Sequence, residues 1–255
     1  MPRPIRSGVH VQTYEAAGLE APVETWGSGG PTLVFLPGLG VDPREYGRGF
    51  ELLAGEFQVI VPNLSFRGGR TLPRSINGYL SFVTALADDV APDAIWAGHS
   101  FGALLAMLGS SPAIACAPSV PAEVALSRMF ARAIRMQVRE YLGFEGRTAI
   151  AYAARTMIEY VSTAALRPRS LFSITGALNS PPHERSPRCP NAVVYLSKRD
   201  ELYRREEYSA YFGAALTSRF QLVEVTEGHD WLITHPERMA ERIREAVSIL
   251  GSTCA

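Results

Sequence analysis

With 255 residues, of which 47% are hydrophobic, the chain is long enough for one sizeable core, and α/β folds of this length are commonly single domains. Lys and Arg together number 25, as do Asp and Glu, so the net charge is zero, which argues against a general attraction to nucleic acid or to an anionic membrane. The three cysteines lie far apart, and we find no signal-peptide pattern and no run of about 18 apolar residues, so we expect a cytoplasmic protein without a disulfide framework, zinc site or membrane span.

The pattern along the chain indicates strands that alternate with helices. Residues 9–14 alternate in character, as a first antiparallel strand would, whereas residues 32–36 form the apolar run that is typical of a buried parallel strand. Asp42-Pro43 predicts a helix start, with Asp as N-cap and Pro at the first helical position. The predicted strands are residues 9–14, 22–26, 32–36, 57–62, 94–97, 113–117, 191–196 and 220–225. The predicted helices are residues 43–53, 78–86, 103–108 and 236–250. This alternation indicates a mostly parallel sheet with helices on both faces.

The α/β rhythm is interrupted between residues 121 and 187. Apolar residues recur there at helical spacing, in residues 124–142 and 148–161. We therefore predict a helical cap insertion over residues 121–187 on an α/β core formed by residues 1–120 and 188–255. Most apolar cap side chains would pack the cap helices, and a few would line a substrate pocket. The pocket residues that we predict are Met129, Tyr141, Tyr152, Tyr160 and Trp231, and for Trp231 a core position is an equal alternative.

The most informative stretch is Gly98-His99-Ser100-Phe101-Gly102, which has the form Gly-x-Ser-x-Gly. It follows the predicted strand 94–97 and precedes the helical run 103–108, which is the strand–turn–helix context of a nucleophile elbow. Such a turn lifts the serine hydroxyl above the sheet, and glycines permit the close packing that it needs. The pattern therefore predicts Ser100 as a nucleophile.

A serine hydroxyl needs a base within hydrogen-bond reach, and the base needs a group that holds its tautomer. His229, in the loop after the last predicted strand, is where the base is expected. His99 adjoins the serine, and its side chain would point away from the hydroxyl. The remaining histidines fit strand, surface or capping positions: His10, His183 and His235.

The acid is expected on a loop at the same edge of the sheet, between the serine and the histidine in chain order. Asp200 follows the predicted strand 191–196 and meets both conditions. Its neighbour Glu201 is the first alternative, and Glu123, after the preceding strand, is the second. A solvated loop charge or a helix cap is the structural alternative for Asp200.

The attack creates an oxyanion that preorganised donors must hold. The backbone N–H of Phe101, directly after the nucleophile, is one expected donor. The loop Pro37-Gly38-Leu39-Gly40 should supply the other, and Leu39 is the favoured residue.

Four segments together resemble the functional loops of the α/β-hydrolase superfamily, in that family's order. They are Pro37-Gly38-Leu39-Gly40, Gly98-His99-Ser100-Phe101-Gly102, Ser197-Lys198-Arg199-Asp200 and Gly228-His229-Asp230. The resemblance covers nearly the whole chain and implies an eight-stranded, mostly parallel sheet, a Ser100–His229–Asp200 triad, a variable cap, and neither a metal nor another cofactor. Two positions depart from the family pattern: Asn63 stands where a loop usually opens with Asp, and Pro37 replaces the frequent histidine before the oxyanion glycine.

A serine nucleophile favours acyl transfer, so we expect a hydrolase of an ester, lactone or thioester of a mainly apolar small molecule. The elbow Gly98–Ala103 is also similar to that of thioesterases of biosynthetic assembly lines, whose acyl group would be carrier-bound. A cyclase, a C–C bond hydrolase or a lyase could use the same triad, and a ligand receptor could keep the fold without catalysis. The sequence indicates no oligomeric state.

Overall fold

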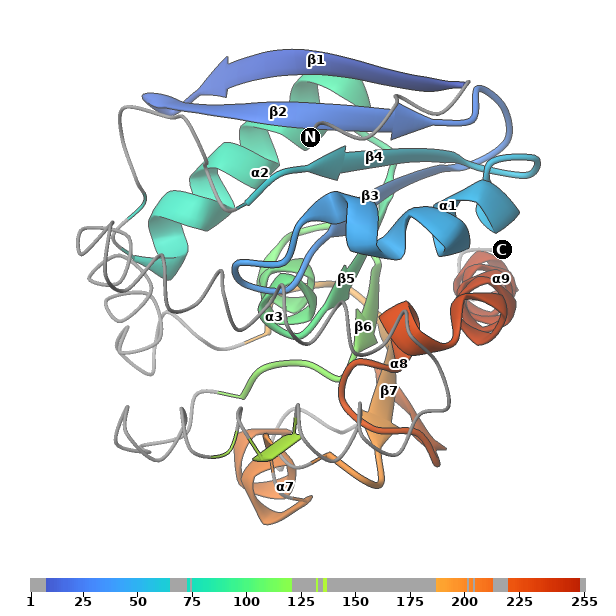
Figure 1. The fold of residues 1–255 in the computed structure, drawn as a ribbon. Coiled ribbons are helices and arrows are strands. Elements are labelled where there is room, and N and C mark those ends of the chain that lie inside the picture. The colour runs from blue at the N-terminus through green and yellow to red at the C-terminus, as the bar shows by residue number, and fades with distance from the viewer. Residues whose placement is uncertain are drawn as a thin grey trace.

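The computed structural model describes residues 8–64, 73, 75–120, 132, 135–136, 187–200, 202–203, 205–212 and 220–252. Its centre is one eight-stranded sheet with the order β1-β2-β4-β3-β5-β6-β7-β8 (Figure 1). The strands are β1 (Val9–Ala16), β2 (Leu19–Trp26), β3 (Thr32–Leu36), β4 (Gln58–Pro62), β5 (Ile95–His99), β6 (Ala113–Cys116), β7 (Ala192–Ser197) and β8 (Phe220–Val225). The eight strands and the mostly parallel arrangement confirm the predicted α/β-hydrolase fold.

The sheet begins antiparallel and then becomes parallel. β1 and β2 form a hairpin that pairs Ala16 with Leu19, and its two turn residues, Ala17 and Gly18, have φ of 52° and 72°. Positive φ at both central positions matches the right-handed twist of the flanking strands, which is why such turns close tight hairpins. β2 pairs antiparallel with β4, and every later pairing, from β4–β3 to β7–β8, is parallel.

The helices lie on both faces of the sheet, as the alternation predicts (Figure 1). They are the 3₁₀ helix η1 (Pro43–Tyr46), α1 (Gly47–Leu53), α2 (Ile76–Val90), α3 (Phe101–Leu108), α7 (Arg205–Phe212), α8 (Trp231–Thr234) and α9 (Pro236–Ser252). Asp42 caps η1 by accepting a 3.0 Å hydrogen bond from the Arg44 N–H. Helix α2 is longer than the predicted 78–86, because Ser75 caps its start through the Gly78 N–H and the chain stays helical beyond Leu86.

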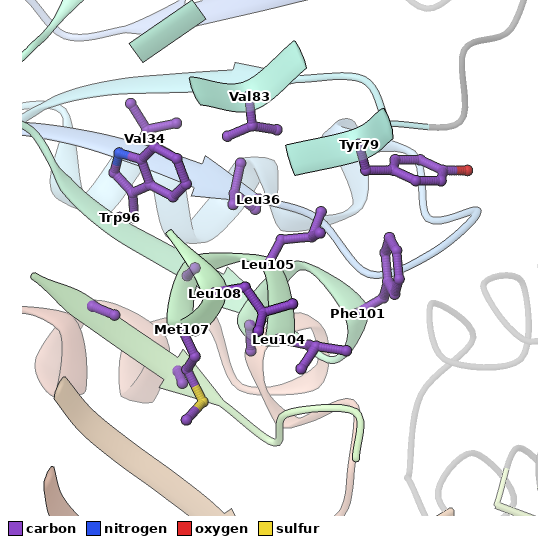
Figure 2. Packing of buried hydrophobic residues seen from close by; sticks show 14 of the residues in the cluster. Val34, Leu36, Tyr79, Val83, Trp96, Phe101, Leu104, Leu105, Met107 and Leu108 are labelled. Carbon is purple, nitrogen blue, oxygen red and sulfur yellow. The ribbon is translucent and has the colours of Figure 1, made fainter. Parts of the chain in front are cut away.

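Two hydrophobic clusters fill the two sides of the sheet. In β3 the side chains alternate, so that Val34 and Leu36 pack with α2 and α3 while Leu33 and Phe35 pack with α1 and α9. We call these the α2/α3 core and the α1/α9 core. All eight residues of α3 are buried, and Figure 2 shows its leucines packed with Val34 and Leu36 of β3 and with residues of α2. The helix that follows the elbow is therefore held rigidly against the sheet.

The predicted cap over residues 121–187 lies almost entirely outside the described residues. Within that range, Arg132 is described, and it donates to both carboxylate oxygens of Glu207 in α7, at 2.8 and 3.0 Å, and to the Leu202 carbonyl at 3.2 Å. These contacts join Arg132 to the segment after β7. Among the helices of the described part of the chain, none has the length and apolar character needed to cross a membrane.

Candidate active site

Ser100 lies at a sharp turn between the end of β5 and the start of α3. Its φ and ψ are 52° and −116°, a conformation that L residues rarely adopt and that persists where the surroundings enforce it. A Cβ at Gly98 would collide with the Gly102 carbonyl group, and a Cβ at Gly102 would collide with the Leu36 carbonyl oxygen at the end of β3. Both glycines are therefore required by close backbone packing, as the elbow pattern predicts.

The loop after β6 holds the elbow from the other side. The Ser100 N–H donates to the Cys116 carbonyl at 3.0 Å, and the Ser119 N–H donates to the Ser100 carbonyl at 2.9 Å. The Ser100 Oγ lies 3.1 Å from the Ser119 Oγ, and Ser119 is only 3% exposed. Sequence reasoning missed Ser119, because a single serine after a strand carries no pattern. Its place directly after the predicted strand 113–117, which pairs with β5, is the signal that could have found it.

His229 and Asp200 come together at the same edge of the sheet, in the loops that follow β8 and β7. The His229 Nδ1 lies 2.8 Å from the Asp200 Oδ2, and both side chains are about 2% exposed or less. Because a carboxylate can only accept, His229 carries its proton on Nδ1, which leaves the lone pair on Nε2. The alternative acids Glu201 and Glu123 lie outside the described residues.

Asp200 accepts hydrogen bonds on both carboxylate oxygens. Its Oδ1 accepts from the N–H groups of Leu202 and Tyr203 at 2.8 and 2.9 Å, and its Oδ2 accepts from the Tyr208 hydroxyl at 2.8 Å as well as from His229. Burial raises the pKa of Asp200, but the charge and hydrogen bond of His229, together with the hydrogen bonds from the Tyr203 backbone and the Tyr208 side chain, outweigh it, so the pKa of Asp200 lies below its ordinary value. Burial and the Asp200 charge raise the pKa of Tyr208 well above its usual range, so Tyr208 remains a donor. Asp200 is therefore an ionised carboxylate held in one orientation.

The loop expected to contribute an oxyanion donor lies beside the elbow. Pro37-Gly38-Leu39-Gly40 follows β3 and closes a turn in which the Val41 N–H donates to the Gly38 carbonyl at 3.0 Å. The backbone collisions of a Cβ at Gly102 involve the carbonyl oxygens of Leu36 and Pro37, so the first turn of α3 is packed directly on this loop. Leu39 is half-buried against the α2/α3 core. Phe101 is the first residue of α3, so its N–H has no acceptor within the helix.

The other histidines occupy different places. The His99 ring is buried, and its nitrogens lie 2.8 Å from the Tyr46 hydroxyl and 3.0 Å from the His229 carbonyl oxygen, so it is engaged away from the Ser100 hydroxyl, as expected. His10 is exposed on β1, and His235 follows α8 with its Nδ1 3.0 Å from the Thr234 hydroxyl. His183 lies outside the described residues.

His99, His229 and Asp230 are buried close together, and one atom of each residue that could ligate a metal ion lies within 4.8 Å of the other two. The His99 Nε2 faces the His229 carbonyl oxygen, and the His229 Nδ1 faces Asp200. These hydrogen bonds account for the closeness of the two imidazoles.

The predicted pocket residues are mostly outside the described part of the chain. Met129, Tyr141, Tyr152 and Tyr160 lie within residues 121–187, outside the described part of the chain. Trp231 is 1% exposed, lies in the α1/α9 core, and contacts the Tyr195 ring at a centroid distance of 6.0 Å. It thus occupies the core position that the sequence left open as the alternative.

Solved structures with the same architecture include several hydrolases. A serine hydrolase involved in carbazole degradation aligns with a TM-score of 0.69 and 17% identity, over 94% of this chain and 99% of that chain. The thioesterase domain from the curacin biosynthetic pathway aligns at 0.65 and 17%, over 92% and 99%. The enol-lactonase from Burkholderia xenovorans LB400 aligns at 0.64 and 15%, over 93% and 100%. At these sequence identities, the structural similarity shows that the chain shares the fold of these proteins.

A comparison with curated proteins gives no match. The family model described as "Alpha/beta hydrolase family" matches residues 33–242, from β3 into α9, and so includes the loop at residues 37–40, the turn at Ser100 and the loops that carry Asp200 and His229. On this match and on the eight-stranded fold, the chain belongs to the alpha/beta hydrolase family of enzymes.

Proposed function

We propose that the protein is a serine hydrolase that cleaves an ester, lactone or thioester of a mainly apolar small molecule through an acyl-enzyme on Ser100. The observation that carries the proposal is the combination of a strained elbow at Ser100 with an ionised Asp200 that is hydrogen-bonded to the His229 Nδ1 at 2.8 Å. All three residues follow the carboxyl ends of parallel strands: Ser100 follows β5, and Asp200 and His229 follow the paired strands β7 and β8, with β6 between β5 and β7. The order Ser, Asp, His along the chain is the order that this fold uses.

In the proposed reaction the Ser100 Oγ attacks the carbonyl carbon while the His229 Nε2 accepts the hydroxyl proton. The tetrahedral oxyanion collapses, the bond to the leaving group breaks, and His229 returns the proton to the departing alcohol or thiol. Water then attacks the acyl-enzyme by the same route and releases the acid and Ser100. Asp200 holds the Nδ1–H tautomer of His229 and stabilises the imidazolium that forms in each half-reaction.

Backbone N–H groups of Leu39 and Phe101 would hold the oxyanion. Both lie where β3 and β5 end and α3 begins, and the packing of Gly102 on the Leu36 carbonyl fixes the two segments against each other. Donors on a rigid backbone need no reorganisation when charge develops, which is how such groups lower a barrier.

Two substrate chemistries have specific support among the structural neighbours. The enol-lactonase favours a lactone or related oxygen ester, and the thioesterase domain favours an acyl thioester. The elbow segment Gly98–Ala103, which is similar to that of assembly-line thioesterases, adds to the second reading. A small-molecule oxygen ester or lactone remains the primary proposal, because it requires no carrier protein.

A fluorophosphonate probe tests the nucleophile directly, since it forms a Ser–O–P bond and releases fluoride only at an activated serine. We expect labelling of the wild-type protein, loss of labelling in Ser100→Ala, and unchanged labelling in Ser110→Ala, which removes an exposed hydroxyl beyond α3. Turnover of p-nitrophenyl butyrate against decanoyl-CoA separates the two substrate chemistries. Undiminished labelling of Ser100→Ala, or ligand-induced stabilisation without any product, would overturn the proposed function.

A further inference from the structure

A buried chain of hydrogen bonds connects three loops around the candidate site. The Gly38 N–H, in the oxyanion loop, donates to the Tyr46 hydroxyl oxygen at 3.1 Å. That oxygen lies 2.8 Å from the Nδ1 of His99, the residue directly before Ser100. The His99 Nε2 lies 3.0 Å from the backbone carbonyl oxygen of His229. The chain therefore passes from the oxyanion loop through the elbow to the backbone of the base.

The partners fix the direction of every bond. A carbonyl oxygen can only accept, so the His99 Nε2 must carry a proton and donate to the His229 carbonyl. In a neutral imidazole the Nδ1 is then an acceptor, so the Tyr46 hydroxyl donates to it while accepting from the Gly38 N–H. Each donor thus meets an acceptor, from Gly38 N–H to Tyr46 O–H to His99 and on to His229.

The surroundings keep His99 neutral. His99 is 1% exposed, and burial, together with the nearby His229, lowers its pKa to about 4, although Asp230 and Asp200 act in the opposite direction. The Asp230 Oδ1 lies 3.8 Å from the His99 Nε2. A neutral His99 is what the direction of the chain requires.

Packing makes the arrangement specific. A Cβ at Gly38 would lie 3.3 Å from the His99 Nδ1 and 3.4 Å from the Tyr46 hydroxyl, so the loop backbone rests directly on the pair. The Tyr46 and His99 rings meet edge to face at 5.8 Å, and the His99 and His229 rings lie 5.1 Å apart. A shift of Tyr46 or His99 would therefore move both the oxyanion loop and the base.

We propose that Tyr46 and His99 are positioning residues that set the oxyanion loop and the His229 backbone relative to Ser100. The inference rests on the proposed function, since it assigns roles to residues of that same site. Neither side chain is proposed to contact the substrate. Small displacements of positioned groups cost a large part of a rate enhancement, so loosening the chain should lower kcat and leave KM nearly unchanged.

The first experiment removes one hydroxyl. Tyr46→Phe should lower kcat for p-nitrophenyl butyrate about tenfold or more, with KM within about twofold, and should weaken an alkyl trifluoromethyl ketone inhibitor, which forms an oxyanion adduct, by the same factor. Tyr14→Phe is the matched control, because its hydroxyl donates to the Ala85 carbonyl at 3.0 Å far from the site. Equal kcat values in Tyr46→Phe and wild type would overturn the proposal.

Two isosteric variants separate the two branches of the chain. The amide of His99→Asn ends where Nδ1 was and retains an acceptor for Tyr46, whereas the amide of His99→Gln ends where Nε2 was and retains a donor to the His229 carbonyl. Combined with Tyr46→Phe, the Gln variant should therefore be non-additive in kcat and the Asn variant additive. Additivity of both, in folded proteins, would show that the hydroxyl and the imidazole act separately.

A measurement on the wild-type protein remains informative even if the variants unfold. Nitrogen NMR of His99 should report a protonated Nε2, an unprotonated Nδ1 and no titration between about pH 5.5 and 9. A protonated Nδ1, or titration near pH 6.5, would refute the chain. Loss of labelling in Ser100→Ala together with wild-type kcat in Tyr46→Phe would refute this inference alone, whereas labelling retained in Ser100→Ala would refute the proposed function.

Discussion

Asp200→Asn tests the acid assignment against its alternatives. The Asp200 Oδ1 accepts from two backbone N–H groups, of Leu202 and Tyr203, so the amide oxygen of an asparagine must take that place. The amide NH₂ then faces the His229 Nδ1 at the position where the Oδ2 now accepts. Two donors cannot share that contact, and His229 is driven to the other tautomer, with its proton on Nε2 and no lone pair for the Ser100 proton.

The expected loss of kcat follows from this change in the tautomer of His229. A base held in the wrong tautomer lowers kcat by about 10⁴, which corresponds to roughly 5.4 kcal/mol in the activation free energy. The Asn side chain keeps the two backbone partners, whereas the Tyr208 hydroxyl, which donates to the Oδ2 in the wild type, must rotate and accept from the amide NH₂, so Asp200→Asn should still fold. The activity loss would then reflect chemistry.

The assay is steady-state turnover of p-nitrophenyl butyrate, with thermal unfolding measured on the same samples. Asp93→Asn is the matched control, because Asp93 is exposed in the turn before β5. Glu201→Gln and Glu123→Gln test the two carboxylates that the sequence left as alternatives. A kcat in Asp200→Asn within tenfold of the wild type, combined with inactivity of either Glu variant, would refute the assignment of Asp200.

Three further predictions concern the support of the site. Tyr208→Phe removes a hydrogen bond to the buried Asp200 carboxylate and should cost about 1.5–3 kcal/mol of unfolding free energy. This loss of unfolding free energy should be complete near neutral pH and shrink below about pH 4. Asp200, whose pKa lies below its ordinary value, stabilises the fold only while its carboxyl is ionised, and the variant raises that pKa. Ser119→Ala removes the hydroxyl 3.1 Å from the Ser100 Oγ and should slow the acylation burst about tenfold. Gly102→Ala places a methyl group against the Leu36 backbone and should cost about 3 kcal/mol, a fall of roughly 6 °C in Tm.

Matched variants distinguish these effects from general damage. Ser110→Ala should leave the burst unchanged, and Gly55→Ala, where a Cβ meets nothing within 4 Å, should leave Tm within about 1 °C. A pH-independent loss in Tyr208→Phe, an unchanged burst in Ser119→Ala, or a wild-type Tm in Gly102→Ala would contradict the respective argument.

The amino-acid sequence by itself determined the elements and their layering. Residues 32–36 form an apolar run and Gly98–Gly102 form a glycine-flanked turn, and these local signals need no distant partner to be read. The predicted strand 220–225 coincides with β8, and the helix start at Asp42-Pro43 is the cap of η1. The boundaries of α2 differ, because the helix continues where a local window of residues suggested its end.

Tertiary structure decided which polar side chains meet one another at the candidate site. Asp200 and His229 could be proposed from their loops, but their 2.8 Å contact requires β7 and β8 to pair in parallel at the edge of the sheet. Ser119 and Tyr46 have no local signature, since they meet Ser100 and His99 across 19 and 53 residues of chain. Hydrophobic spacing and turn chemistry act over a few residues and can be read from the sequence, whereas hydrogen bonds between loops depend on the register of a sheet that exists only once the chain has folded.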